Sequence, residues 1–155
     1  MDQEKIPSIA ERENEIRGKF ATFQHPDDKW KWILQLAREH PGMDPRLRDE
    51  KFLVKGCAAR MFLVPEFRDG VLWLHMDTEA GDENPLFSRG LGALALHLYH
   101  KQKPSEILKA RAEFFQDIGL QVGLSPSRAN GFASLLRQIG LYAQVYARLE
   151  ATRKA

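Results

Sequence analysis

The chain has 155 residues, of which 43% are hydrophobic and 28% charged, and these values suit one soluble globular domain over residues 1–155. A formal net charge of +2 is too small to imply nucleic acid or an anionic membrane as a partner, and neither is expected. No apolar run is long enough to span a bilayer. A single cysteine excludes a disulfide framework, so a cytoplasmic location is expected.

Two amphipathic helices are predicted in the first third of the chain. Residues 8–23 are charged, with spaced apolar positions. Asp27 or Asp28 can cap the second helix, whose apolar residues recur at i, i+3, i+4 and i+7. Pro41-Gly42 ends that helix, and the polar segment up to Glu50 is expected to be an ordered loop.

Three short strands are predicted between residues 52 and 77. The apolar runs 52–54, 61–67 and 71–76 are separated by turn signals at Lys55-Gly56 and Arg68-Asp69-Gly70. The last run is apolar on both faces, so we expect it at the centre of the sheet, with the proline-containing middle run ending at an edge.

Helices are predicted to return from about residue 86. A further helix opens at Pro104 and carries apolar residues as far as Ile118, and Ser125-Pro126 starts a long final helix as cap and first residue. The predicted fold class is therefore α+β, with a short three-stranded antiparallel sheet flanked by helices.

The only cysteine, Cys57, lies on the tight turn predicted between the first two strands. Gly56 gives the backbone freedom for that turn. Lys55 and Arg60 place two cations nearby in the sequence, and a nearby cation favours the reactive thiolate. A lone thiol can act as a nucleophile, a redox group or a carrier, but it makes neither an internal disulfide nor a thiolate-rich metal site.

Two other readings of Cys57 stay open. Free cysteine is usually buried and acts as a small hydrophobic residue, so the chain can be an interaction module with an inert thiol. Alternatively, Cys57 with His75 and Asp77 forms a stand-alone thiol-dependent enzyme, since alternation along a strand puts the latter two on one face. The acidic stretch 77–84 lacks the spacing of a calcium loop, so no metal site is expected.

Four motifs, together with Pro41 and Arg48 upstream of them, make the chain resemble the SufE family, from about residue 27 to residue 145. The resemblance rests on Pro41 and Arg48 upstream of the cysteine, Val54-Lys55-Gly56-Cys57 (V-x-G-C in the family), Asp77-Thr78-Glu79-Ala80 (D-S-D-A), Arg89-Gly90-Leu91 ([KR]-G-L) and Leu124–Gly131 (L-[ST]-P-x-R-x-N-G). Motifs that agree in order and spacing are far more specific than any single motif.

This resemblance implies a SufE-like fold and a sulfur acceptor rather than an independent enzyme. Cys57 would take persulfide sulfur from a SufS-like cysteine desulfurase, activate that enzyme, and pass the sulfur on for iron–sulfur cluster assembly, with a cluster scaffold protein downstream. Pyridoxal phosphate belongs to the desulfurase, so no cofactor is expected on this chain. Lys55, Arg60 or Arg128 would support the thiolate.

The chain departs from the family pattern at three places. Ala59 replaces a serine close to the cysteine, Glu79 replaces an aspartate, and residues 81–85 resemble a short insertion. These changes bear on the choice of desulfurase. Arg128, near the positive end of its helix, is expected to have a carboxylate partner such as Asp77 or Glu79. Gly131 costs about 1 kcal/mol relative to alanine there, which suggests close backbone packing.

Overall fold

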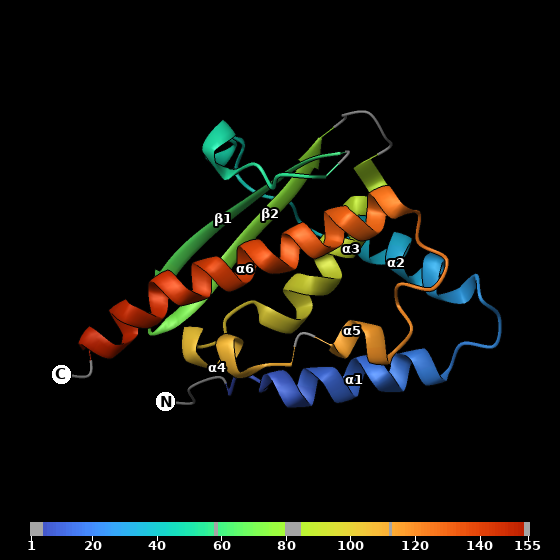
Figure 1. Ribbon diagram of the computed structural model, residues 1–155, viewed down its shortest axis with the longest axis horizontal. Helices are drawn as coiled ribbons and strands as arrows, with labels where there is room; N and C mark the ends of the chain where they lie inside the picture. Colours follow the sequence, from blue (N-terminus) through green and yellow to red (C-terminus); the bar gives the residue numbers. More distant parts are fainter. Residues whose placement is uncertain (1–4, 58, 80–84, 112, 154–155) are drawn as a thin grey trace.

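The computed structural model describes residues 5–57, 59–79, 85–111 and 113–153. Its helices and strands are α1 (Ile9–Ala21), α2 (Asp28–Glu39), η1 (Pro45–Leu47), η2 (Glu50–Phe52), β1 (Arg60–Arg68), β2 (Val71–Glu79), α3 (Pro85–Tyr99), α4 (Pro104–Lys109), α5 (Phe114–Asp117) and α6 (Pro126–Arg153). Figure 1 shows α6 running diagonally in front of the strands, with α3 behind it and α1 along the opposite side. None of the helices described has the length and hydrophobicity needed to cross a lipid bilayer.

The described sheet has two strands, and the prediction of a third is wrong. β1 and β2 pair antiparallel, from Arg60 opposite Glu79 to Arg68 opposite Val71. They are joined by a tight turn whose two central residues, Asp69 and Gly70, both have positive φ, 56° and 80°. That combination is typical of a type I′ hairpin turn, which matches the right-handed twist of paired strands.

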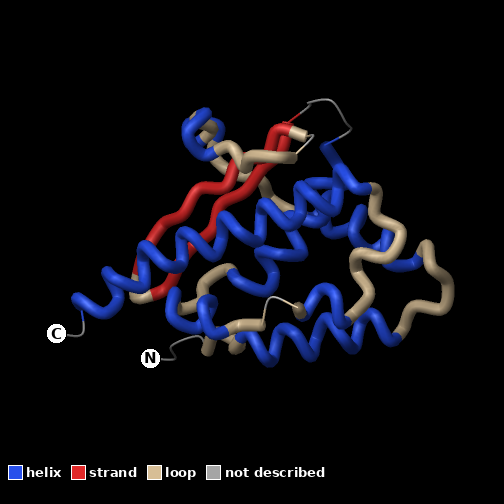
Figure 2. The backbone as a smooth tube through the Cα atoms, viewed as in Figure 1, coloured by secondary structure: helices blue, strands red, loops and turns tan. Residues whose placement is uncertain are grey.

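The predicted first strand, 52–54, is instead the end of a 3-10 turn followed by one bridge. Asp49 caps η2 by accepting a hydrogen bond from the Lys51 N–H at 3.0 Å. Only Leu53 then bridges to β1, opposite Phe62. The capped turn holds residues 50–52 in helical geometry, so they cannot extend a strand. Figure 2 shows this turn and the following loop against one end of the sheet.

The sequence predicts β2 at the centre of the sheet, but no described strand pairs with its second edge: Leu72 forms a single bridge to Gln102, and side chains cover the positions that follow. The Leu74 N–H donates to His100 Nδ1 at 3.0 Å, and the Met76 carbonyl accepts from His40 Nε2 at 2.7 Å. Burial, together with the nearby charge of Lys101, lowers the pKa of His100 to about 4, so its ring is neutral and can accept this bond. The imidazoles therefore satisfy backbone groups that an adjacent strand would otherwise pair.

The helix predicted to run from Pro104 to Ile118 is broken into α4 and α5. Ala110 is extended (φ −67°, ψ 142°), which ends α4. Leu108 and Phe115 would share a face in one continuous helix because they are two turns apart. Yet Leu108 is 45% exposed and Phe115 only 1%. The break allows Phe115 to turn into the core.

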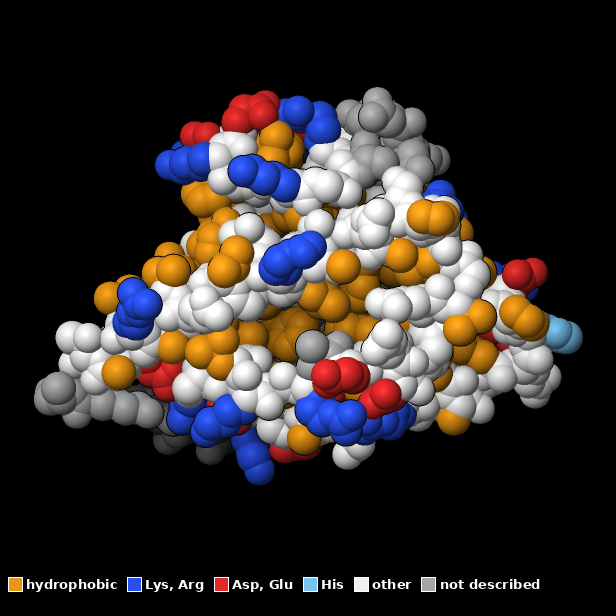
Figure 3. Space-filling view, in the orientation of Figure 1, with side chains coloured by type: hydrophobic (Ala, Val, Ile, Leu, Met, Phe, Trp, Pro, Cys, Tyr) orange, Lys and Arg blue, Asp and Glu red, His pale blue; other side chains and the backbone are white. Residues whose placement is uncertain are grey.

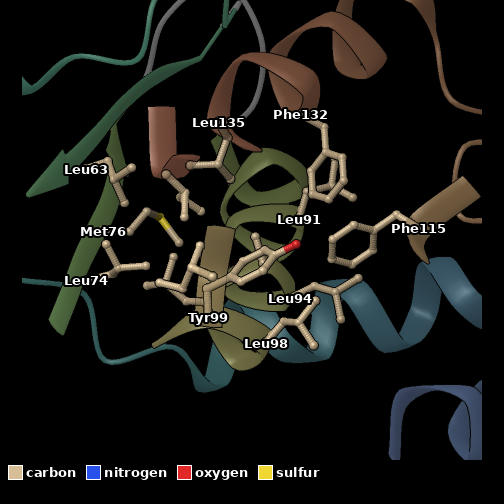
Figure 4. Close-up of a cluster of buried hydrophobic side chains, with 14 of the residues drawn as sticks. Leu63, Leu74, Met76, Leu91, Leu94, Leu98, Tyr99, Phe115, Phe132 and Leu135 are labelled. Carbon is tan, nitrogen blue, oxygen red and sulfur yellow. The ribbon is translucent and has the colours of Figure 1, made fainter. Parts of the chain in front are cut away.

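The hydrophobic core lies between the sheet, α3 and α6. Figure 4 shows side chains from these elements and α5 converging on it: Leu63, Leu74, Met76, Leu91, Leu94, Leu98, Tyr99, Phe115, Phe132 and Leu135. The helix predicted from about residue 86 is confirmed as α3, in which Leu91, Leu94, Ala95 and Leu98 are all buried. Because α3 is enclosed, it provides a rigid base for the start of α6 and for the turn that carries Cys57.

Candidate functional site

Cys57 lies on a closed turn immediately before β1, half-buried against the core. The Val54 N–H donates to the Met61 carbonyl at 2.8 Å, which closes the turn. Gly56 has φ +87°, a left-handed conformation that side chains disfavour. The predicted position of the cysteine on a glycine-containing turn is therefore confirmed, although only one of the flanking segments is a strand.

The thiol rests directly on the backbone of α6. A Cβ built on Gly131 would lie 3.3 Å from Cys57 Sγ and 3.4 Å from its Cα. Close backbone packing at this glycine, predicted from its unfavourable place in a helix, is confirmed. The start of α6 is set by its cap, where the Arg128 N–H donates to Ser125 Oγ at 3.2 Å.

A small cavity of about 10 Å³ adjoins the thiol, roughly the space of one water-sized atom. Its walls come from the Cys57 turn, β1, α3 and the first turns of α6: Cys57, Met61, Ser88, Leu91, Ser127, Arg128, Gly131, Phe132 and Leu135. The lining is mainly apolar. The site is therefore a sheltered pocket beside the sulfur atom rather than an open cleft.

Among the three cations predicted to support the thiol, Arg128 lines this cavity, and its guanidinium lies over the Phe87 ring at 4.2 Å. Lys55 is exposed and does not line the cavity. Arg60 binds the carboxylates of Glu79, at 2.8 Å, and Glu50, at 2.5 Å. These two hydrogen bonds raise the pKa of Arg60. The geometry thus favours Arg128 as the cation that acts beside the sulfur.

Asp77 lies in a buried ion cluster with two arginines. Its carboxylate accepts from Arg48 at 2.7 Å, from Arg89 and from the Thr78 N–H at 2.8 Å. Burial by itself raises the pKa of Asp77, but the Thr78 hydrogen bond and the charges of Arg89 and Arg48 outweigh it, and the net effect is a lowered pKa. A Cβ on Gly42 would lie 2.7 Å from the Asp77 carboxylate, so a glycine is required for the backbone at residue 42 to pass this close to Asp77.

A second carboxylate, Glu79, extends this cluster towards the surface. It accepts from Arg60 and, at 3.3 Å, from Arg48, which therefore joins the two carboxylates. The hydrogen bond from Arg60 lowers the pKa of Glu79. Within the described residues, Arg128 forms no ion pair with either carboxylate, so Asp77 and Glu79, the two examples named for its expected partner, are not that partner. The 81–85 insertion lies mostly outside the described residues, since only Pro85 is described.

His75 is not brought to Cys57. It lies opposite Val64 in the sheet and lines a different cavity, with His97 and His100. Alternation puts His75 on the face opposite its buried neighbours Leu74 and Met76. The proposed triad of Cys57, His75 and Asp77 is therefore not assembled, because its general base, His75, does not lie beside the thiol. Within the described ranges, no cluster of three or more His, Cys, Asp or Glu side chains is arranged to hold a metal ion.

The start of α3 contributes site residues whose roles the sequence did not reveal. The Arg89 guanidinium binds Asp77 and donates to the carbonyls of Ala37, at 3.0 Å, and His40, at 2.7 Å. Gly90 lies against α2, and Leu91 lines the thiol cavity. The sequence did offer one signal for a buried partner of Arg89. This cation lies in the first turns of an apolar helix, where the helix dipole disfavours a positive charge.

Replacing Gly131 with alanine should make the Cys57 thiol react faster with a soluble thiol reagent, by about threefold or more, because the new methyl group crowds the sulfur and displaces the turn. The unfolding free energy should change by no more than about 1 kcal/mol, since alanine favours the helix while the contact opposes it. Reagent kinetics and urea denaturation measure the two effects.

The control for that variant is Gly140→Ala on the same helix. Nothing lies within 4 Å of a Cβ built at Gly140. This substitution should leave thiol reactivity unchanged. Equal reactivity of the Gly131 variant and the wild type would show that the glycine does not position the thiol.

Comparisons with known proteins show the family and the fold of this chain. The family model of the SufE Fe–S metabolism associated domain matches residues 14–143, and so includes part of α1. An uncharacterized SufE-like protein of Rhizobium meliloti is 30% identical over 131 residues, 81% of this chain and 90% of that protein. One from Synechocystis is 29% identical over 120 residues, 76% of this chain and 72% of that protein.

A solved structure shares the fold. The solution structure of a hypothetical protein from Thermus thermophilus superposes with a TM-score of 0.70, at 18% identity, and covers 89% of this chain and 96% of that one. The structural likeness concerns the fold alone, whereas the family match spans the Cys57 turn, β1, β2 and most of α6. The chain belongs to the SufE family, whose domain is associated with Fe–S metabolism.

Proposed function

We propose that this chain accepts sulfur on Cys57 from a pyridoxal-phosphate cysteine desulfurase and passes it on for iron–sulfur cluster assembly. In the transfer, the Cys57 thiolate attacks the outer sulfur of the desulfurase's cysteine persulfide. A bond forms between Cys57 Sγ and that sulfur, the persulfide S–S bond breaks, and the desulfurase thiolate leaves. No oxidant is consumed, and the sulfur then moves to an acceptor such as a cluster scaffold by the same displacement.

The observation that carries this proposal is the cavity beside Cys57 Sγ. Its volume of about 10 Å³ is of the order of one further atom, which suits the terminal sulfur of a persulfide. Arg128 lines the cavity, and its positive charge would stabilise a persulfide anion at low dielectric. The apolar remainder of the wall would limit attack by dissolved oxidants on the loaded sulfur.

Transfer between two proteins requires the sheltered thiol to become accessible. The turn is closed by the Val54–Met61 hydrogen bond, and Gly56 supplies the backbone freedom for it to open. Docking of a partner against the exposed Lys55 side of the turn would favour the open state. The chain then acts as a carrier and activator, while the desulfurase performs the chemistry on free cysteine.

Incubating the chain with a desulfurase and free cysteine should add sulfur only to Cys57. Intact-mass spectrometry should show the addition, and a thiol reductant should remove it. Cys57→Ser should gain no sulfur and should lose the stimulation of desulfurase turnover. The serine variant keeps a side chain of similar size, so its fold should persist, and this can be checked by circular dichroism.

Two results would overturn the proposal. Stimulation by the serine variant equal to that by the wild type would indicate an interaction module with an inert cysteine. Turnover of a substrate by the chain alone, dependent on Cys57, would indicate a thiol-dependent enzyme.

A further inference from the structure

A basic groove of about 370 Å³ adjoins the Cys57 turn and shares no lining residue with the thiol cavity. It is lined by Lys51, Leu53, Lys55, Ser134, Arg137, Gln138 and Leu141, a set with three cations and no carboxylate. A Cβ on Gly56 would lie 3.0 Å from Ser134 Oγ, so the groove wall contacts the turn itself. Anything bound in this groove lies next to the carrier cysteine.

The three cations of the groove are not neutralised within the part of the chain that the structure describes. The Lys51 ammonium lies over the Phe52 ring at 5.1 Å, and no ion pair with a carboxylate is formed by Lys55 or Arg137 among the described residues. Of the nearby carboxylates, Glu50 binds Arg60, and Glu79 binds both Arg60 and Arg48, whereas Asp49 accepts a hydrogen bond from the Lys51 N–H. The lining of the groove itself therefore carries a net positive charge.

An apolar stripe on α6 continues the groove. Leu141 also lines the groove and is 48% exposed, Val145 is 58% exposed and Leu149 is 47% exposed. Their spacing of four residues puts them in one row along the helix, about 12 Å long at 1.5 Å per residue. Figure 3 shows basic and hydrophobic side chains along α6 on this face, with most acidic ones near the margins of the view.

We propose that this groove and stripe bind an amphipathic acidic helix of the cysteine desulfurase. The proposal rests on the function proposed above. Carboxylates of that helix would pair with Lys51, Lys55 and Arg137, and its apolar side chains would cover the stripe, a helix-against-groove arrangement. A second copy of this chain is disfavoured, because a symmetric contact would bring like charges together.

Reversing the groove charges should weaken docking without stopping the chemistry. Sulfur transfer to Cys57 is followed by quenched-flow mass spectrometry at increasing concentrations of the desulfurase from the source organism. The variant Lys51→Glu, Arg137→Glu should need about ten times more desulfurase for half-maximal rate at low salt, with the maximal rate within about twofold of wild type. Added salt should shrink the difference.

A matched control changes the net charge by the same amount at exposed cations elsewhere: Lys31→Glu, Lys103→Glu. It should behave as the wild type does. Equal half-saturation of the groove variant and the wild type would overturn the docking proposal while leaving Cys57 as the acceptor. Failure of wild-type Cys57 to gain sulfur at any desulfurase concentration would instead overturn the proposed function.

A photo-cross-linking amino acid at position 145 tests the occupant directly. In the presence of desulfurase it should yield a cross-link that maps to an acidic amphipathic helix of that enzyme. The same probe at Val122, which is 72% exposed and lies before α6, should yield none. A cross-link from position 145 only to a second copy of this chain, or to a basic segment of the desulfurase, would contradict the proposal.

Discussion

Replacing Asp77 with asparagine should lower the free energy of unfolding by about 3 kcal/mol at neutral pH, because it leaves two arginines next to a neutral group in a buried cluster. Asparagine keeps the size of the side chain and one acceptor oxygen, so the loss reports the missing charge. Arg48 and Arg89 are 30% and 22% exposed, and neither can move fully into water without breaking other contacts. Urea denaturation measures the change.

The effect of this substitution should depend on pH. The pKa of Asp77 is lowered in the folded chain, so its charge contributes stability that is fully present above the usual aspartate value of about 4. That stability is lost as pH falls through the lowered folded value. The wild type and the Asp77→Asn variant should therefore differ most at neutral pH and converge in acid, where Asp77 is also neutral.

Asp44→Asn is the matched control, because Asp44 makes an equally short ion pair, 2.7 Å to Arg46, at the surface. Exposed pairs contribute little to stability. This variant should unfold at nearly the same urea concentration as the wild type. If Asp77→Asn did the same, the buried cluster would not stabilise the fold.

Replacing Gly90 with alanine should also cost about 3 kcal/mol, since overpacking a rigid contact forces the backbone to shift. A Cβ at this position would lie 2.2 Å from the Ile33 carbonyl oxygen and 2.7 Å from Ile33 Cγ2. The oxygen belongs to the backbone of α2, so the two helices must separate. Thermal unfolding should show a lower Tm, with a change of roughly 2–4 °C for each kcal/mol.

Two other helical glycines give a graded comparison. A Cβ on Gly92 would meet the methyl end of Met76 at 2.6 Å, and this flexible end can move, so Gly92→Ala should cost less than Gly90→Ala. Nothing lies within 4 Å of a Cβ at Gly18, so Gly18→Ala should stabilise α1 by up to about 1 kcal/mol. A different order among the three variants would contradict this account of the α2–α3 contact.

The Asp77 cluster and the Gly90 contact are both linked to the candidate site by three consecutive residues of α3. Arg89 binds Asp77, Gly90 allows α2 to pack closely against α3, and Leu91 lines the cavity beside Cys57. A change at either of the first two residues therefore disturbs the helix that supports the cysteine. Its effect on sulfur transfer should follow the loss of stability, whereas Cys57→Ser should abolish transfer in a stable chain.

Local signals in the sequence determined the start of α6, the hairpin turn and the position of the cysteine. Ser125-Pro126 starts α6 because a side-chain cap and a preset φ act within one turn of the chain. The turn at Arg68–Gly70 could be predicted because glycine adopts positive φ readily, and this preference does not depend on the rest of the fold. The family motifs added the expected role of Cys57.

The tertiary structure alone decided the number of strands, the partners of the charged residues and the surroundings of the thiol. An apolar run predicts a buried strand but does not show that imidazoles from His40 and His100 will cover its edge. Asp77 had several arginines available, and only the packing of distant segments selected Arg48 and Arg89. Gly131 likewise gained its contact with Cys57 only when α6 packed across the turn. Such pairings depend on how separate segments assemble, and short-range spacing carries no information about that.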